Sequence, residues 1–272
     1  MRKNIFIKSF LFVTVLSLGL CSCEKEDEST DGTGNGVNLN RDLVLYYTFD
    51  EGATNGVTQI VTDHSGNAHN GICEGQAEFV TDHNGYVLRL RKGDFVNIPT
   101  AAFSDSTNVT VSVWLKDFGQ GAIFTSENNG TMVTPSLYIT NDDKMAYEYG
   151  TSPGFNWSTV RFSNLLTSYQ GSGWHHILVA TSGKRGECLF YIDGIHVDTK
   201  EGGQSKCNAN KMMIGGNGSG FLNFWSDPML IDNVRVYQRC LNPKEVTEIY
   251  EDTTYMATYI QSINEYDITW VD

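Results

Sequence analysis

The feature that most restricts the fold of this 272-residue chain is a succession of short apolar or alternating runs, separated by Gly, Asn, Asp and Ser. Runs of this length and spacing predict β-strands joined by tight turns. Residues 109–115 show the pattern clearly: the odd-numbered residues are apolar and are expected to face inward, whereas Thr110 and Ser112 are expected to face outward. Asp193-Gly194 separates two further runs, and this dipeptide favours a hairpin with a primed turn.

About a dozen such strands at regular spacing predict an all-β domain, either a sandwich or a barrel. The expected strands are Leu43–Phe49, Tyr86–Leu90, Asp94–Ile98, Val109–Leu115, Ala122–Thr125, Ser136–Ile139, Lys144–Tyr149, His175–Thr181, Cys188–Ile192, Ile195–Thr199, Lys211–Ile214 and Met229–Tyr237. No internal repeat of solenoid length is visible.

One short helix is expected near the C-terminal end of the domain. Asn242 is a favourable N-cap, Pro243 suits the first helical position, and Glu245 can reach back to the N-cap backbone. Val246, Ile249 and Tyr250 follow at spacings of three and four, which gives one apolar face. We expect a two-turn helix packed on a sheet edge.

The N-terminal segment predicts a lipoprotein signal rather than a part of the fold. Basic residues precede a short apolar run from Phe10 to Leu20, and this run is too short to span a bilayer. The sequence Leu20-Cys21-Ser22-Cys23 resembles a bacterial lipobox in which Cys23 accepts the lipid. The alternative is an ordinary signal peptide with two incidental cysteines.

An acidic and glycine-rich segment follows Cys23. Residues 24–36 contain too few apolar side chains to bury, so we expect a solvated tether. An acidic stretch directly after the lipidated cysteine resembles the surface-export signal of Bacteroidetes lipoproteins, although a generic polar spacer would have the same composition. The resulting expectation is an outer-membrane protein, anchored by lipid only and exposed at the cell surface.

The charge of the chain argues against nucleic-acid binding. The sequence has 19 Lys and Arg residues against 32 Asp and Glu residues, for a formal net charge of −13. No basic excess is therefore present to neutralise phosphates. Much of the acidity lies in the segments that flank the predicted domain, so the charge says little about the ligand.

Six segments in order resemble the LamG-like jelly-roll family of the concanavalin A-like lectin/glucanase superfamily. They are 47–51 (Tyr-Thr-Phe-Asp-Glu), 63–67 (Asp-His-Ser-Gly-Asn), 109–114, 173–177 (Gly-Trp-His-His-Ile), 190–194 and 231–237 (Ile-Asp-Asn-Val-Arg-Val-Tyr). Residues 235–246 are similar to the usual C-terminal signature of the family, although Cys240 stands where a small apolar residue is common. The resemblance covers residues 43 to 250 and implies two stacked antiparallel sheets, a jelly-roll sandwich with one short C-terminal helix.

The resemblance implies less about activity, because this fold carries enzymes, lectins and adhesion modules. Glycosidases of the superfamily use a Glu-x-Asp-x-x-Glu strand, and the nearest match here is Glu265-Tyr266-Asp267, where Trp270 replaces the last carboxylate. His175 and His176 are neighbours on a strand and are expected to face opposite sides, one buried and one exposed. We therefore predict no catalytic residues and a protein that is not an enzyme.

Calcium is the expected metal. In related domains the first strand, the Asp-x-Ser-Gly-Asn loop and the late Ile-Asp strand meet at one edge, and this resemblance makes Asp50, Asp63, Asn67 and Asp232 the candidate ligands. The alternative is that Asp63, Ser65 and Asn67 make side-chain turns.

Aromatic side chains are the expected platform for a sugar, because pyranose faces stack on apolar rings. Trp114 and Trp174 align with core positions of the family and are expected to be structural. Trp157 and Trp225 lie in segments with loop-like composition, and Tyr147 and Tyr149 alternate on one strand face, so these four residues form the predicted ligand-binding set. A loop tryptophan that only covers the core is the alternative.

Four cysteines remain after Cys21 is removed and Cys23 is lipidated. An oxidising compartment permits disulfides, and we predict the pairs Cys188–Cys207 and Cys73–Cys240. Four cysteines allow three connectivities, and free buried thiols are the alternative. A zinc site is not expected, because no Cys-x-x-Cys pair survives processing.

These inferences combine into one expectation. Residues 1–22 form a lipoprotein signal peptide, 23–42 an acidic tether, 43–250 the concanavalin A-like domain and 251–272 an extension of unknown structure. The expected function is non-catalytic carbohydrate binding, with a polysaccharide or glycan as the partner. The alternatives are a protein-binding or adhesion module and a glycoside hydrolase with an unrecognised site.

Overall fold

The computed structural model describes residues 37–52, 59–82, 85–99, 107–129, 131–150, 157–171, 173–202, 209–216 and 228–252. Its strands are β1 (Leu43–Tyr47), β2 (Ile60–Val61), β3 (Gly71–Glu74), β4 (Glu78–Asp82), β5 (Gly85–Leu90), β6 (Phe95–Ile98), β7 (Thr110–Lys116), β8 (Gly121–Asn128), β9 (Thr131–Ile139), β10 (Lys144–Gly150), β11 (Trp157–Leu165), β12 (His175–Ser182), β13 (Glu187–Ile192), β14 (Ile195–Glu201), β15 (Lys211–Gly215) and β16 (Met229–Tyr237). Helix α1 (Pro243–Tyr250) follows β16.

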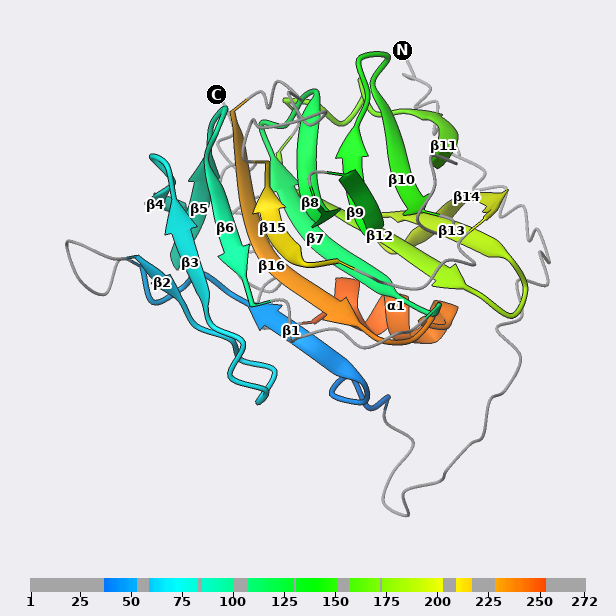
Figure 1. Cartoon of the computed structure of the whole chain (residues 1–272), viewed down its shortest axis with the longest axis horizontal. Coiled ribbons are helices and arrows are strands. Elements are labelled where there is room, and N and C mark those ends of the chain that lie inside the picture. Colours follow the sequence, from blue (N-terminus) through cyan, green and yellow to red (C-terminus); the bar gives the residue numbers. More distant parts are fainter. Residues whose placement is uncertain are drawn as a thin grey trace, which may run out of the picture.

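The strands form two antiparallel sheets that pack face to face (Figure 1). Sheet A has the order β14-β13-β12-β7-β16-β5-β4, and β1 also pairs with β16. Sheet B has the order β11-β10-β9-β8-β15-β6-β3-β2. The all-β jelly-roll sandwich predicted from the sequence is therefore confirmed. The short strands β2, β3 and β4 and the strand β11 were not expected.

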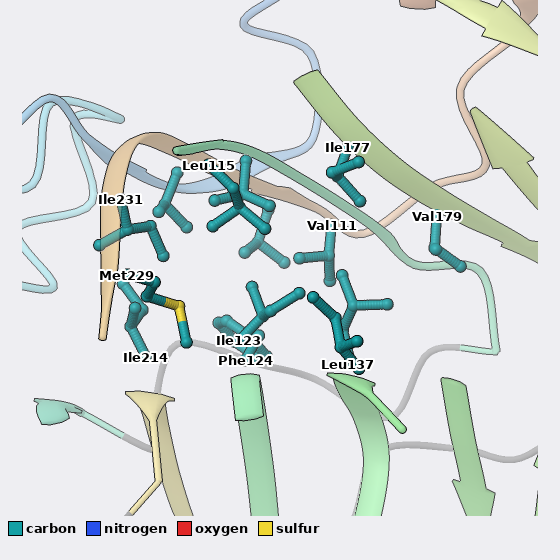
Figure 2. Packing of buried hydrophobic residues seen from close by; sticks show 14 of the residues in the cluster. Val111, Leu115, Ile123, Phe124, Leu137, Ile177, Val179, Ile214, Met229 and Ile231 are labelled. Carbon is teal, nitrogen blue, oxygen red and sulfur yellow. The ribbon is translucent and has the colours of Figure 1, made fainter. Parts of the chain in front are cut away.

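The main hydrophobic core lies between the two sheets (Figure 2). Val111 and Leu115 of β7 and Ile231 of β16 extend from sheet A toward Phe124 and Leu137 of sheet B. The odd-numbered residues of β7 thus face inward, as the alternation predicts. Burial of these side chains removes a large apolar area from water, which is the main stabilising contribution to the sandwich.

The hairpin between β13 and β14 turns at Asp193-Gly194. Both residues have positive φ, 50° and 73°, as a primed two-residue turn requires. Gly194 also lies against Tyr250 of the helix, because a Cβ atom at this position would approach the tyrosine ring to 2.9 Å. The predicted hairpin is confirmed, and its glycine serves both the turn and the packing of α1.

Helix α1 begins with the predicted capping box. The Asn242 side chain accepts a hydrogen bond from the Glu245 backbone at 3.0 Å, and the Asn242 backbone donates to Glu245 Oε2 at 2.9 Å. The prediction that the helix packs on a sheet edge is wrong. Val246 and Ile249 join a second apolar cluster with Leu178 of β12 on the outer face of sheet A. The helix covers a sheet face because β7, β12 and β13 present apolar and aromatic side chains on both of their sides.

None of the described helical residues forms a segment with the length and apolar character needed to cross a bilayer.

Candidate functional site

The loop that contains Asp63 is organised by hydrogen bonds within the chain. Asp63 is 8% exposed. Its Oδ1 accepts from the backbone N–H groups of Tyr46 and Ser65 at 3.0 and 2.9 Å. Its Oδ2 accepts from the Ser65 hydroxyl at 2.8 Å and from the His69 backbone at 2.9 Å. Both carboxylate oxygens therefore already interact with two donors each.

Asn67 links the same loop to the first strand by hydrogen bonds. Its side-chain amide donates to the carbonyl oxygens of Leu43 and Val44 at 2.9 and 3.1 Å. An amide nitrogen that points at these carbonyls is a donor, and a cation requires oxygen ligands. The contacts of Asp63 and Asn67 thus favour the side-chain turns that were the alternative to calcium.

The two remaining predicted calcium ligands differ in exposure. Asp50 is exposed, whereas Asp232 is 1% exposed and accepts a hydrogen bond from the Asn233 backbone at 2.8 Å. Within the described ranges, no group of three or more His, Cys, Asp and Glu side chains is placed to hold a metal ion. As placed, these residues fit a calcium ion poorly, and calcium binding stays a prediction.

The predicted aromatic platform is wrong at Tyr147. This side chain is 1% exposed and belongs to the core between the sheets. The register explains the error: Met145 and Tyr147 face the core, so Ala146 and Glu148 face outward. The loop expected around Trp157 is also wrong, because Trp157 begins β11 and its backbone pairs with Gly150.

The remaining members of the predicted platform lie outside what the structure describes. This applies to the side chains of Tyr149 and Trp157 and to the whole of Trp225. The prediction that Trp114 and Trp174 are structural is confirmed, since they are 4% and 5% exposed and pack with Val87 on the outer face of sheet A.

The cysteines differ from their predicted pairing. Cys73 and Cys240 lie in different parts of the sandwich. Cys73 packs against the core between the sheets, whereas Cys240 packs against the cluster under helix α1, so a Cys73–Cys240 bond is wrong. Cys188 is a free, buried thiol in the core, while its predicted partner Cys207 and the predicted lipid acceptor Cys23 lie outside the described residues.

The two adjacent histidines face opposite sides of β12, as predicted. His176 is completely buried, and its Nε2 lies 2.8 Å from the Ser112 hydroxyl. Burial, together with the charge of Arg235, lowers the pKa of His176 to about 3. His175 is half-buried and contacts Asp193 at 2.8 Å. A serine and histidine in contact resemble part of a catalytic triad, but this pair is sealed under α1 and His176 Nδ1 has no hydrogen-bond partner.

The outer face of sheet B carries a buried cluster of polar and apolar side chains that the sequence reasoning missed. Met132, Tyr138 and Ala146 form a small apolar cluster there. Glu148 lies beside it and is bonded to the hydroxyl groups of Tyr138 and Thr159. We call Tyr138, Ala146, Glu148 and Thr159 the Glu148 patch. The alternation of residues 144–149 was the sequence signal that could have revealed this cluster. The sequence prediction assigned the face with Tyr147 and Tyr149 to the ligand, and Glu148 lies on the opposite face.

The two paired antiparallel sheets and their strand order define a β-sandwich of the jelly-roll type. Residues 90–247 match the sequence model of a family described as the concanavalin A-like lectin/glucanases superfamily, and the chain belongs to this family. Comparison of the sequence with curated proteins gives no match.

Several solved structures of clostridial toxin binding domains are similar in fold. The binding domain of Paraclostridial Mosquitocidal Protein 1 has a TM-score of 0.60 and 18% identity, and the alignment covers 80% of this chain and 54% of that one. The binding domain of botulinum neurotoxin DC in complex with rat synaptotagmin II has a TM-score of 0.61 and 14% identity, over 80% and 53%.

A third similar structure is that of botulinum neurotoxin type C, whose cell entry is described as dependent on interaction with two ganglioside molecules. Its TM-score is 0.60 and its identity 14%, again over 80% of this chain and 53% of the other. This chain therefore spans about half the length of the toxin domains that it matches. At these identities the likeness shows the fold, which these neighbours use in binding domains.

Proposed function

We propose that this protein is a non-catalytic carbohydrate-binding module. The observation that carries the proposal is the two-sheet sandwich, whose residues 90–247 match the concanavalin A-like lectin/glucanases superfamily. Sugar sites combine apolar surface, which packs against the C–H face of the ring, with a few polar groups that accept or donate hydrogen bonds to hydroxyls.

The comparisons support a binding role without selecting the ligand. The family includes lectins and glucanases by its description, and the similar toxin domains are named as binding domains. One of those structures contains a protein partner and another is described with gangliosides. The choice of a glycan for this chain comes from the family to which it belongs.

The proposal includes display at the outer membrane through a lipid on Cys23. The basic residues, short apolar run and lipobox-like ending of the N-terminal segment support it. Expression of the full chain in a bacterial host with labelled palmitate is the test. Label is expected on the wild type and is expected to be absent from the Cys23→Ser variant, and equal labelling of both would contradict the assignment.

A glycan array probed with the purified protein tests the binding function. Saturable binding to one class of glycan is expected, together with no release of reducing sugar from the same glycans on prolonged incubation. Release of reducing ends would place the protein among the glycosidases of the fold, and an array without any signal would contradict carbohydrate binding.

A further inference from the structure

The outer face of sheet A carries an apolar cluster that extends beyond helix α1. It crosses four neighbouring strands, β4, β5, β16 and β7, and Tyr250 is the residue of α1 that joins it. Val80 of β4 and Leu230 of β16 pack against the cluster but keep part of their surface exposed. We call the whole set the Trp174 cluster: Val80, Val87, Trp114, Trp174, Leu230 and Tyr250.

The exposed part of this cluster is a contiguous surface and not a set of scattered side chains. Val80 lies opposite Val87 in the sheet register, and Leu230 lies opposite Lys116 of the next strand. Contiguous apolar surface on the outside of a sheet is unfavourable in water and marks a place where another segment or molecule packs. The Trp174 cluster is therefore a candidate docking surface.

Basic side chains border the Trp174 cluster. Lys116 pairs with Asp82 at 2.9 Å. Arg89 and Arg91 share the Glu78 carboxylate, at 2.6 and 2.7 Å. Three cations thus stand against two carboxylates along this border. The surface favours an occupant that is both apolar and acidic.

The chain leaves α1 directly beside this surface. Asp252, the last described residue, follows Tyr250 by two positions, and its Oδ2 lies 2.5 Å from Arg235 Nη2 of β16. The next residues, 253–272, include three acids and no Lys or Arg. Their large apolar side chains are Tyr255, Met256, Tyr259, Ile260, Ile263, Tyr266, Ile268, Trp270 and Val271.

The length of this segment is sufficient to reach across the cluster. Four strands about 4.8 Å apart span roughly 15 Å, and six extended residues cover about 20 Å. The contact between Asp252 and Arg235 holds the start of the segment on the outer face of sheet A. Residues 253–272 therefore combine the apolar side chains, the acidic charge and the starting point that the surface requires.

We propose that residues 253–272 dock on the Trp174 cluster of their own chain. Their apolar side chains pack against Val80 and Leu230, and their acidic side chains face Lys116 and Arg89. The inference is independent of the proposed carbohydrate-binding function. It adds that the docked segment withdraws this aromatic face from the surface available to a glycan, so that a glycan binds elsewhere on the sandwich.

Limited proteolysis of the full-length protein tests the docking. Chymotrypsin cleaves after aromatic residues, and residues 253–272 offer Tyr255, Tyr259, Tyr266 and Trp270. A docked segment is cleaved only when it is released from the surface. Cleavage within 253–272 of Leu230→Asp is expected to be about tenfold faster than in wild type, because a charge replaces an apolar contact. Mass spectrometry identifies the cleaved bonds.

Ile72→Asp is the matched control. Ile72 is 42% exposed and belongs to β3 of sheet B, in the other layer of the sandwich. Cleavage within 253–272 is expected to keep the wild-type rate in this variant. A second variant, Ile260→Asp with Ile263→Asp, changes the segment and leaves the sandwich untouched. It is expected to be cleaved as fast as Leu230→Asp, and thermal melting confirms that each variant is folded.

Faster cleavage in Leu230→Asp and in the segment variant, with the wild-type rate in Ile72→Asp, supports the inference. Equal rates in wild type and in a folded Leu230→Asp would overturn it. A wild-type segment that is cleaved as fast as a free peptide of the same sequence would also overturn it. Cleavage that accelerates when the protein is diluted would place the segment on a second copy and contradict docking within one chain. None of these outcomes depends on glycan binding.

Discussion

The Tyr250 ring at the end of α1 is stacked on the Trp114 ring of β7, with centroids 5.7 Å apart and planes inclined by 13°. This contact joins the C-terminal turn of the helix to the outer face of sheet A. Val246 and Ile249 make the other apolar contacts of the helix. The stack therefore fixes the end of the helix that lies farther from its capping box.

Replacement of Tyr250 tests this role. Tyr250→Ala is expected to lower the free energy of unfolding by about 1–3 kcal/mol, because a half-buried aromatic ring loses its packing against Trp114 and Gly194. Urea titration followed by tryptophan fluorescence measures the change. Tyr86→Ala, at a tyrosine that is 41% exposed, is the control and should cost less. Equal losses in the two variants would contradict a specific role for the stack.

The Asp63 loop gives a second prediction. Asp63→Asn is expected to lower the melting temperature, because one of the two oxygens that accept hydrogen bonds from Tyr46, Ser65 and His69 becomes an amide. We expect the same loss in calcium and in chelator. A melting temperature of the wild type that rises in calcium, with the rise absent in Asp63→Asn, would instead support calcium coordination at this loop.

The half-buried Cys73 and the buried Cys188 give a third prediction. Burial raises the pKa of the Cys188 thiol to about 12, and burial together with Asp94 and Glu74 raises that of Cys73 to about 12. Neither thiol forms an appreciable amount of reactive thiolate near neutral pH. A thiol reagent is therefore expected to label Cys73 and Cys188 only after denaturation, without added reductant. A requirement for reductant would show that these thiols are oxidised, and rapid labelling of the native protein would contradict their burial.

Glu148 gives a fourth prediction, on pH and stability. Its pKa is raised from the ordinary value of 4.5, so the native state binds this proton more tightly than the unfolded state. The stability that this proton provides is complete below pH 4.5 and is lost as the pH rises through the folded pKa. Glu148→Gln should therefore gain stability relative to wild type between pH 4.5 and neutral pH. A difference in melting temperature that does not change with pH would contradict this.

The sequence predicted the parts of the fold that depend on local pattern. Val109 to Val113 alternates strictly, so both the strand and its inward face were predictable. Asp193-Gly194 specified its turn because few residues tolerate positive φ. Strand β2 has only two residues and β4 is half-buried along most of its length, so neither has a periodicity that a sequence can reveal.

The candidate site was less predictable, because it depends on which side of a strand meets the other sheet. The alternation in residues 144–149 divides the strand into two faces but does not assign either to the core. Tyr147 is large and aromatic and so resembled a sugar platform, yet it faces inward, and Glu148 lies on the outer face. The position of α1 was set in the same way by contacts with Leu178 and Leu189, which are remote in sequence.

His176 gives the last prediction, on unfolding in acid. Its ring is enclosed by Trp114, Tyr250 and Ser112, and burial and the charge of Arg235 hold its pKa at about 3 against an ordinary value of 6.5. The neutral ring therefore contributes stability that is complete above pH 6.5 and is lost as the pH falls toward 3, because the unfolded chain takes up the proton first.

The loss should amount to about 1.4 kcal/mol for each pH unit within that window. His176→Gln is uncharged at every pH and should lose less stability than wild type between pH 6.5 and 4.5 in urea titrations. The two proteins are compared by the slope of their free energy of unfolding against pH. A lower stability of the variant at neutral pH therefore does not affect the comparison. His196→Gln, in the exposed hairpin after β13, should keep the wild-type slope. Equal slopes in His176→Gln and wild type would mean that His176 takes up its proton in the folded state, and that the closed packing of α1 over β7 and β12 opens in acid.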